Sequence, residues 1–133
     1  MNTYLNKQNA HLILSAGILI LASLLYGLYP ERILPELFEV EIDSVDLKNI
    51  FRAIMCLYLG IAWILVLGIL KPEYWKFATL LSLVFMGCLA FGRVLSFILD
   101  GSPSMFLILG FFGEMILAVF SFWQLRYYKR EGL

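Results

Sequence analysis

Residues 92–114 read GRVLSFILDGSPSMFLILGFFGE, which is two apolar runs separated by the short polar turn DGSP. So short a turn leaves the two runs room only to pack side by side as antiparallel helices. Each run contains one ionisable residue, Arg93 before the turn and Glu114 after it. The stretch therefore predicts a helical hairpin with a charged side chain on each arm.

The composition of the whole chain requires lipid as its solvent. Of the 133 residues, 62% are hydrophobic and 16% are aromatic, and the mean hydropathy is +0.86. This is more apolar surface than a soluble domain of that length could bury. Lys and Arg balance Asp and Glu at ten each, so the net charge does not predict a nucleic-acid partner. We predict an integral membrane protein whose surroundings are the lipid bilayer.

Four apolar segments are each long enough to cross a hydrocarbon core of about 30 Å. They cover residues 11–29, 49–70, 74–99 and 103–126. The first exceeds the apolar part of a signal peptide and is not followed by a small-residue cleavage site, so we interpret it as a retained helix. In the hairpin turn, Gly101 is expected to end the third helix, with Ser102 as cap and Pro103 as first residue of the fourth. We predict one all-α domain over residues 1–133, a four-helix transmembrane bundle.

The one long connector, residues 30–48, is acidic and has apolar residues at helical spacing. Its acidic residues are Glu31, Glu36, Glu39, Glu41, Asp43 and Asp46. The pattern fits either a short amphipathic segment on the membrane surface or a solvated acidic loop with a few buried side chains.

Six of the ten basic residues fall on the side of the bundle opposite this connector, which itself carries only Arg32 and Lys48. They are Lys7, Lys71, Lys76, Arg126, Lys129 and Arg130. The positive-inside rule therefore places both termini in the cytoplasm, and the acidic connector and the DGSP turn outside.

Three charged residues of the apolar segments lie in the outer half of the membrane. Arg52 is near the start of the second segment, Arg93 lies about 10 Å below the outer turn, and Glu114 lies about 16 Å below it. A charge in hydrocarbon costs about 2.5–3.5 kcal/mol on insertion scales. We therefore expect Arg93 to pair with Glu114, and Arg52 and Asp100 to complete a polar cluster that opens outward. The alternative is that Arg93 reaches outward to Asp100 while a protonated Glu114 binds a backbone carbonyl.

Small and polar residues recur at spacings of three and four on the helix faces that carry these charges. They are Ser82, Met86, Ala90, Arg93, Ser96 and Asp100 on the third segment, Gly110, Glu114, Ala118 and Ser121 on the fourth, and Arg52, Cys56, Leu59 and Trp63 on the second. Such stripes indicate faces turned toward the bundle interior. The pairs Ser23/Gly27 and Cys88/Gly92 fit packing within the bundle or contacts between protomers.

The residues that most often hold metals or redox groups are scarce. Cys56 and Cys88 form no C-x-x-C pair, and His11 is the only histidine. The sequence therefore predicts no thiol-redox pair, no metal site and no cofactor.

Four motifs resemble a known family. They are YPER at the end of the first apolar segment, FRAIMCLYLGIA in the second, GRVLSFILDGSPS at the end of the third, and FFGEMILA in the fourth. They look like the small bacterial four-helix membrane proteins of the domain of unknown function DUF4345, which is itself similar to DoxX-like tetraspan proteins. The resemblance covers nearly the whole chain and implies a four-helix bundle, with no activity to transfer. We expect a multi-pass protein of the bacterial cytoplasmic (inner) membrane.

Three classes of function fit these features. The first is binding of a small anionic or amphiphilic ligand in an outward-facing pocket, by Arg52, Arg93, Asp100 and Glu114 with Trp63 or Tyr58 below them. The second is a non-catalytic interaction or assembly subunit that docks on a membrane-protein partner or on a second copy of the chain. The third is an enzyme or proton-coupled carrier for a lipophilic substrate that uses Glu114 as acid or base. With one deep carboxylate and no nucleophile paired with a base, we rank the third class last and name no catalytic residue.

Overall fold

The described part of the chain is almost entirely helical. The computed structural model describes residues 7–38 and 40–130, with side chains up to Tyr127, so Glu39 and the side chains of Lys129 and Arg130 lie outside the described residues. The helices are α1 (Ala10–Gly27), α2 (Pro30–Phe38), α3 (Val45–Leu70), α4 (Pro72–Leu99) and α5 (Met105–Arg130). Within this described part, α1, α3, α4 and α5 are long and apolar enough to cross a membrane, in agreement with the four predicted spans.

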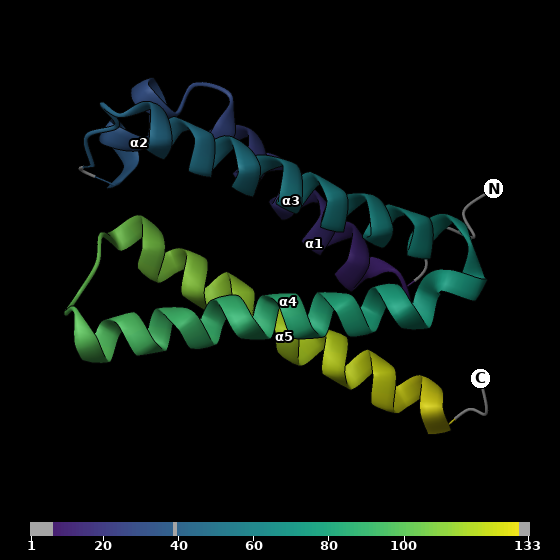
Figure 1. The fold of residues 1–133 in the computed structure, drawn as a ribbon. Helices are drawn as coiled ribbons and strands as arrows, with labels where there is room; N and C mark the ends of the chain where they lie inside the picture. Colours follow the sequence, from purple (N-terminus) through teal and green to yellow (C-terminus); the bar gives the residue numbers. More distant parts are fainter. Residues whose placement is uncertain (1–6, 39, 131–133) are drawn as a thin grey trace.

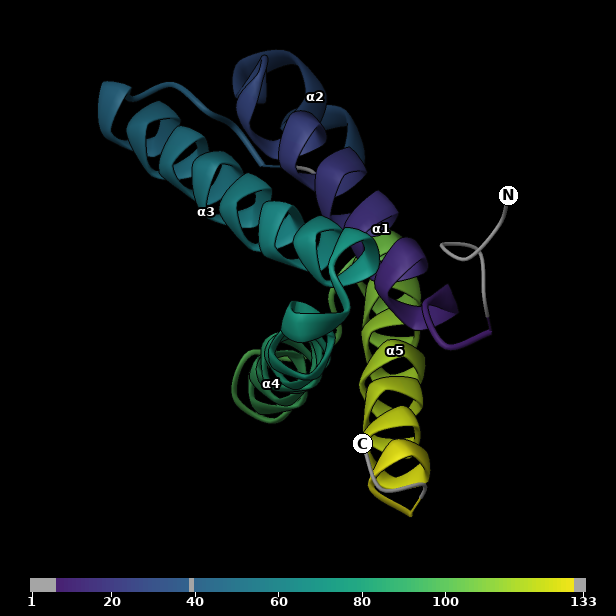
Figure 2. The ribbon, with the colours of Figure 1, turned by 90° about the vertical axis from the view of Figure 1, so that its right-hand side faces the viewer.

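The long helices form two layers (Figure 1). In one layer α1 packs along α3, and in the other α4 packs along α5. The tight connection at Lys71 joins α3 to α4, while α2 covers the end of the molecule where α1 stops and α3 begins. Viewed end-on, α1 lies against both α3 and α5 (Figure 2). The start of α1 and the end of α5 therefore lie at the end of the molecule opposite α2.

Helix α3 begins four residues earlier than the apolar pattern predicts. It starts at Val45, and the Oγ of Ser44 accepts a hydrogen bond from the backbone N–H of Leu47 at 3.1 Å. A serine at this position satisfies an amide that the first helical turn leaves unpaired, and Asp46 adds a negative charge where the helix dipole favours one. Hydropathy alone does not detect this polar first turn.

The α4–α5 turn is longer than predicted. Gly101 ends α4 as expected, with a φ of 96° that favours glycine. Helix α5 begins at Met105 rather than at residue 103, because the carbonyl of Ser104 accepts the first helical hydrogen bonds. The expected cap at Ser102 and first position at Pro103 are therefore wrong. Both residues belong to the turn that reverses the chain.

The acidic connector contains a helix, as one of its two interpretations expected. In α2, Pro30 and Leu34 are buried, and the Phe38 ring lies 5.9 Å from that of Tyr26 on α1 and 5.7 Å from that of Phe106 on α5. The acidic residues of the connector that the structure describes are all exposed. Helix α2 thus ties the end of α1 to the start of α5 through aromatic contacts.

The core lies where α1, α3 and α4 approach one another. Leu12, Leu65 and Ala78 from these three helices are completely buried. A methyl group at Gly68 would overlap the Cβ of Ala78, so the missing side chain lets α3 and α4 touch. The small residue at this position therefore allows the two layers to approach closely near the α3–α4 connection.

The two small-residue pairs differ in their environment. A side chain at Gly27 would collide with Met55 of α3, and Ser23 is buried, so this pair packs within the bundle. Cys88 is exposed, and a Cβ at Gly92 would meet no atom within 4 Å. The second pair therefore lies on the outer surface of α4.

Candidate functional site

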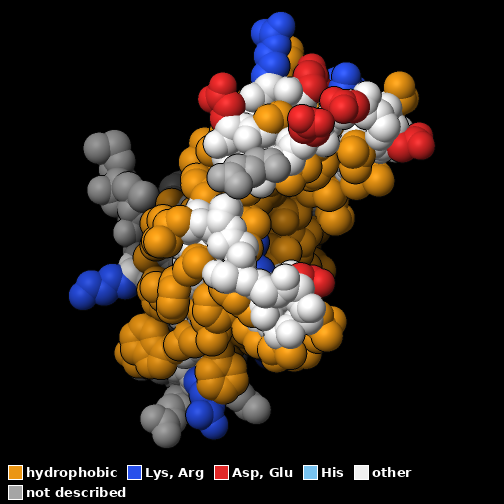
Figure 3. Space-filling model, turned by 90° about the vertical axis from the view of Figure 1, so that its left-hand side faces the viewer, with side chains coloured by type: hydrophobic (Ala, Val, Ile, Leu, Met, Phe, Trp, Pro, Cys, Tyr) orange, Lys and Arg blue, Asp and Glu red, His pale blue; other side chains and the backbone are white. Residues whose placement is uncertain are grey.

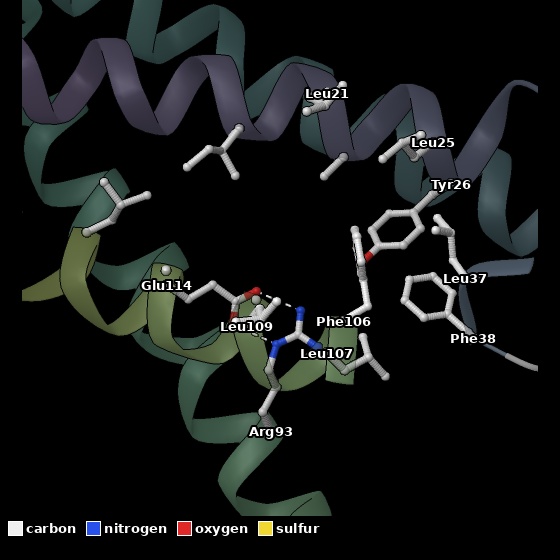
Figure 4. A pocket seen from close by; sticks show the side chains of 15 residues that line it. Leu21, Leu25, Tyr26, Leu37, Phe38, Arg93, Phe106, Leu107, Leu109 and Glu114 are labelled. Atoms are coloured by element: carbon white, nitrogen blue, oxygen red, sulfur yellow. Dashed lines mark hydrogen bonds and ion pairs between the residues drawn. The ribbon is translucent and has the colours of Figure 1, made fainter. Parts of the chain in front are cut away.

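Arg93 on α4 and Glu114 on α5 form an ion pair with two hydrogen bonds. The Nε of Arg93 donates to Oε2 of Glu114, and Nη2 donates to Oε1, each at 2.7 Å (Figure 4). The two side chains are 21% and 11% exposed, and no other ion pair joins residues that the structure describes. The predicted pairing is confirmed. The alternative, in which Arg93 reaches Asp100 and Glu114 binds a backbone carbonyl, is wrong.

The surface of α5 lets the arginine reach the carboxylate. Gly110 lies one helical turn before Glu114, and a Cβ at Gly110 would lie 3.5 Å from Nη2 of Arg93. The guanidinium therefore lies over the glycine and meets the carboxylate at the next turn. Gly110 and Glu114 are four residues apart and share one helix face.

The structure does not bring Arg52 and Asp100 to this pair. Asp100 is exposed, and its Oδ2 accepts a hydrogen bond from Ser96 Oγ at 2.8 Å, because Ser96 lies one turn earlier on the same helix face. Arg52 is exposed on α3, and a long side chain near a helix end can extend its charge to the membrane surface. Of the predicted four-residue cluster, the structure joins only Arg93 and Glu114.

The predicted inward face of α3 is also wrong. Cys56 is exposed, and Trp63 is 64% exposed, so Trp63 does not lie below the pair. The helix instead buries Ala62, Leu65 and Gly68, because residues that allow close approach determine which side of α3 faces the core. Within the described residues, no group of three His, Cys, Asp or Glu side chains could hold a metal ion.

A cavity of about 270 Å³ adjoins the ion pair (Figure 4). Three helices supply its walls, and α4 contributes Arg93 alone. The other lining residues are Ile18, Leu21, Ala22, Leu25 and Tyr26 from α1, Leu37 and Phe38 from α2, and Phe106, Leu107, Leu109, Gly110, Gly113, Glu114 and Leu117 from α5. The polar side chains among them are Arg93, Glu114 and Tyr26, and the remaining surface is apolar.

The polar end of the cavity presents hydrogen-bond donors. A guanidinium has more N–H groups than one carboxylate accepts, and Nη1 of Arg93 lies on the side away from Glu114. The hydroxyl of Tyr26 is directed toward the guanidinium (Figure 4). The sequence predicts Tyr26 only as an aromatic residue of the outer membrane interface, and it does not place Tyr26 in the site.

The cavity lies in the half of the molecule that carries α2 and the α4–α5 turn. Viewed from that end, the surface has a hollow below the acid-rich region (Figure 3). A basic side chain is visible inside this hollow. The walls of the hollow are hydrophobic.

A second polar cluster lies deeper in the bundle. Ser121 Oγ donates to Ser82 Oγ at 3.1 Å, and Ser82 Oγ donates to Ser15 Oγ at 3.2 Å. His11 Nε2 lies 3.0 Å from Thr79 Oγ1, which donates to a backbone carbonyl and therefore accepts from the histidine. Ser82 and Ser121 face the interior as predicted. The His11–Thr79 contact was missed, although His11 and Ser15 are four residues apart and share a face of α1.

The sequence matches the family model described as a domain of unknown function (DUF4345) over residues 8–125. The match covers most of the chain, and the protein belongs to this family. No curated protein and no solved structure matches the chain significantly. Since the family description names no activity, a function has to be argued from the residues of the site.

Proposed function

We propose that the protein binds a small amphiphilic molecule within the membrane. The observation that carries this proposal is the position of the Arg93–Glu114 pair at the polar end of an otherwise apolar cavity. Apolar walls suit a hydrocarbon tail, and guanidinium N–H groups suit an oxygen-bearing head. In surroundings without water, an acceptor on the ligand would bind guanidinium N–H groups beside Glu114 and the hydroxyl of Tyr26.

Small residues beside the ion pair support a binding role. Gly113 lines the cavity, and a Cβ built there would meet no atom within 4 Å. Ala22 is part of the α1 wall. Larger apolar residues at such positions would add packing contacts without displacing the ion pair. An ion pair that only held α4 to α5 would not require this space.

The surroundings of Glu114 favour binding over proton transfer. Both of its carboxylate oxygens accept N–H groups from Arg93, and protonation of Glu114 would remove the negative charge that balances this guanidinium. Leu117 lies between Glu114 and Ser121 along α5 and belongs with Leu19 and Met86 to one buried apolar layer of the core. A proton-coupled carrier would need a polar path across that layer.

Recovery of a bound amphiphile tests the proposal. We would purify the wild type and the Gly113→Leu and Gly60→Leu variants in mild detergent and identify bound lipids by mass spectrometry. Leucine at position 113 fills the cavity, whereas position 60 is exposed and a Cβ there also meets no atom within 4 Å. We expect one amphiphile species with the wild type and with Gly60→Leu, and its loss with Gly113→Leu. Equal recovery from all three proteins would refute the proposed function.

A further inference from the structure

Two leucines that line the cavity are also part of the outer surface of the bundle. Leu21 on α1 is 62% exposed, and Leu109 on α5 is 63% exposed. On a helix that spans the membrane, an exposed apolar side chain faces hydrocarbon. The cavity therefore communicates with the bilayer between α1 and α5. A ligand can reach it sideways from the lipid phase.

The polar end of the cavity has no net formal charge. Glu114 balances Arg93 through two contacts of 2.7 Å, and no other side chain that lines the cavity is charged. A carboxylate or phosphate head would add an unbalanced negative charge inside the membrane, where charge is costly. A cationic head would in the same way add an unbalanced positive charge beside Arg93.

The surface near the cavity adds to this discrimination against anions. Acidic side chains gather at the end of the molecule that carries α2 (Figure 3). The described acids of the connector and the first turn of α3 are Glu31, Glu36, Glu41, Asp43 and Asp46, against the basic residues Arg32 and Lys48. An anionic head at the membrane surface would therefore meet like charge before it reached Arg93.

We infer that the ligand is an uncharged single-chain lipid with a carbonyl or hydroxyl head, and that it enters from the bilayer between α1 and α5. Its head oxygen accepts a hydrogen bond from Nη1 of Arg93, and its chain leaves past Leu21 and Leu109 into the hydrocarbon. A volume of about 270 Å³ is just below the range of about 300–1,000 Å³ for whole ligand sites. It suits a head and the start of one chain. The inference rests on the proposed binding function and specifies its ligand.

Three probes with the same oleyl chain separate the possible heads. They are monooleoylglycerol, oleic acid and oleylamine, compared at about pH 9, where the acid is ionised and the amine is protonated. Each is added to purified protein in detergent, and bound probe is counted by native mass spectrometry. We expect monooleoylglycerol to bind the wild type at least about tenfold more tightly than either charged probe. Gly113→Leu should lose this binding and Gly60→Leu should keep it.

A charge change within the site gives a second measurement. Glu114→Gln removes the balancing carboxylate and leaves the guanidinium charge available to a ligand. Oleic acid should then bind this variant about tenfold more tightly than monooleoylglycerol. If Glu114→Gln does not fold, the wild-type comparison decides by itself. A folded Glu114→Gln that kept the wild-type preference would overturn the charge-balance argument.

The outcomes separate this inference from the proposed function. One outcome is that the wild type binds a charged probe more tightly than monooleoylglycerol and that Gly113→Leu loses that binding. This result would refute the inference of an uncharged head, and it would support amphiphile binding in the cavity. A wild type that binds none of the three probes above the level of Gly113→Leu would overturn both.

Discussion

Replacing one partner of the Arg93–Glu114 pair with methionine is expected to destabilise the bundle, and replacing both is expected to restore most of the loss. Either single variant leaves one charged group without its partner. Breaking a buried ion pair in this way costs about 3–5 kcal/mol. Because Arg93 is 21% exposed, we expect the lower end of this range, about 3 kcal/mol for each single variant. The double variant leaves two apolar side chains of similar length and is expected to lie within about 1 kcal/mol of the wild type.

The measurement is the free energy of unfolding of all four proteins, obtained by equilibrium titration with a denaturing detergent in mixed micelles. The four values form a double-mutant cycle, which isolates the coupling between Arg93 and Glu114 from the effect of each substitution alone. Single variants that each cost less than about 1 kcal/mol, with additive effects in the double variant, would refute the reasoning. Such a result would mean that each group is solvated independently of the other.

Two further outcomes test the packing and the orientation of the bundle. Gly68→Ala is expected to lower the free energy of unfolding by about 1–3 kcal/mol, because the new methyl group overlaps a methyl group of α4. The control is Gly60→Ala, where a Cβ meets no atom within 4 Å. Equal melting temperatures of the two variants in thermal unfolding would contradict the close approach of α3 and α4. The expected orientation is tested by cysteine labelling in a variant without Cys56 and Cys88. Asp43→Cys should react with a membrane-impermeant maleimide in intact cells, and Lys71→Cys should react only after the membrane is permeabilised. The reverse pattern would contradict cytoplasmic termini.

The spans and the ion pair were predictable because hydrocarbon imposes strong constraints. A spanning helix needs a long apolar run, so the segments of the four helices are visible in the sequence. A charge inside such a run needs a partner or water. The short turn between α4 and α5 left Arg93 and Glu114 few partners other than each other. These constraints depend on residue type and chain length, and both can be taken directly from a sequence.

The rotation of α3 about its own axis was not predictable in this way. Arg52 and Trp63 were assigned to the interior because they are polar or amphipathic, yet both are exposed. A charge near a helix end can reach the membrane surface, and an aromatic ring on the outside of the bundle is surrounded by lipid. Polarity therefore constrains the rotation of a membrane helix only near the middle of the span. On α3 the small residues Ala62 and Gly68 determine the packed face.

The cavity could not be foreseen because it depends on helices that are not consecutive in the sequence. Its walls come from α1, α2 and α5, and no turn length relates α1 to α5. Tyr26 and Gly113 gain their place in the site only through this packing. A sequence pattern predicts which face of one helix is buried, but it does not predict how far two such faces stay apart.

The double methionine variant and Gly113→Leu separate two properties of the site, which are its polar contact with the head and its space for the chain. In the double methionine variant, the cavity keeps its apolar walls and its opening between α1 and α5 but has no N–H donors. A hydrocarbon chain can still enter such a cavity, and the hydroxyl of Tyr26 remains in its lining, so the preference among probes with different heads is expected to become smaller. In Gly113→Leu the ion pair remains but the space is filled, so no probe is expected to bind. If both results hold, the space beside Gly113 determines whether an amphiphile binds, and the Arg93–Glu114 pair determines which head it carries.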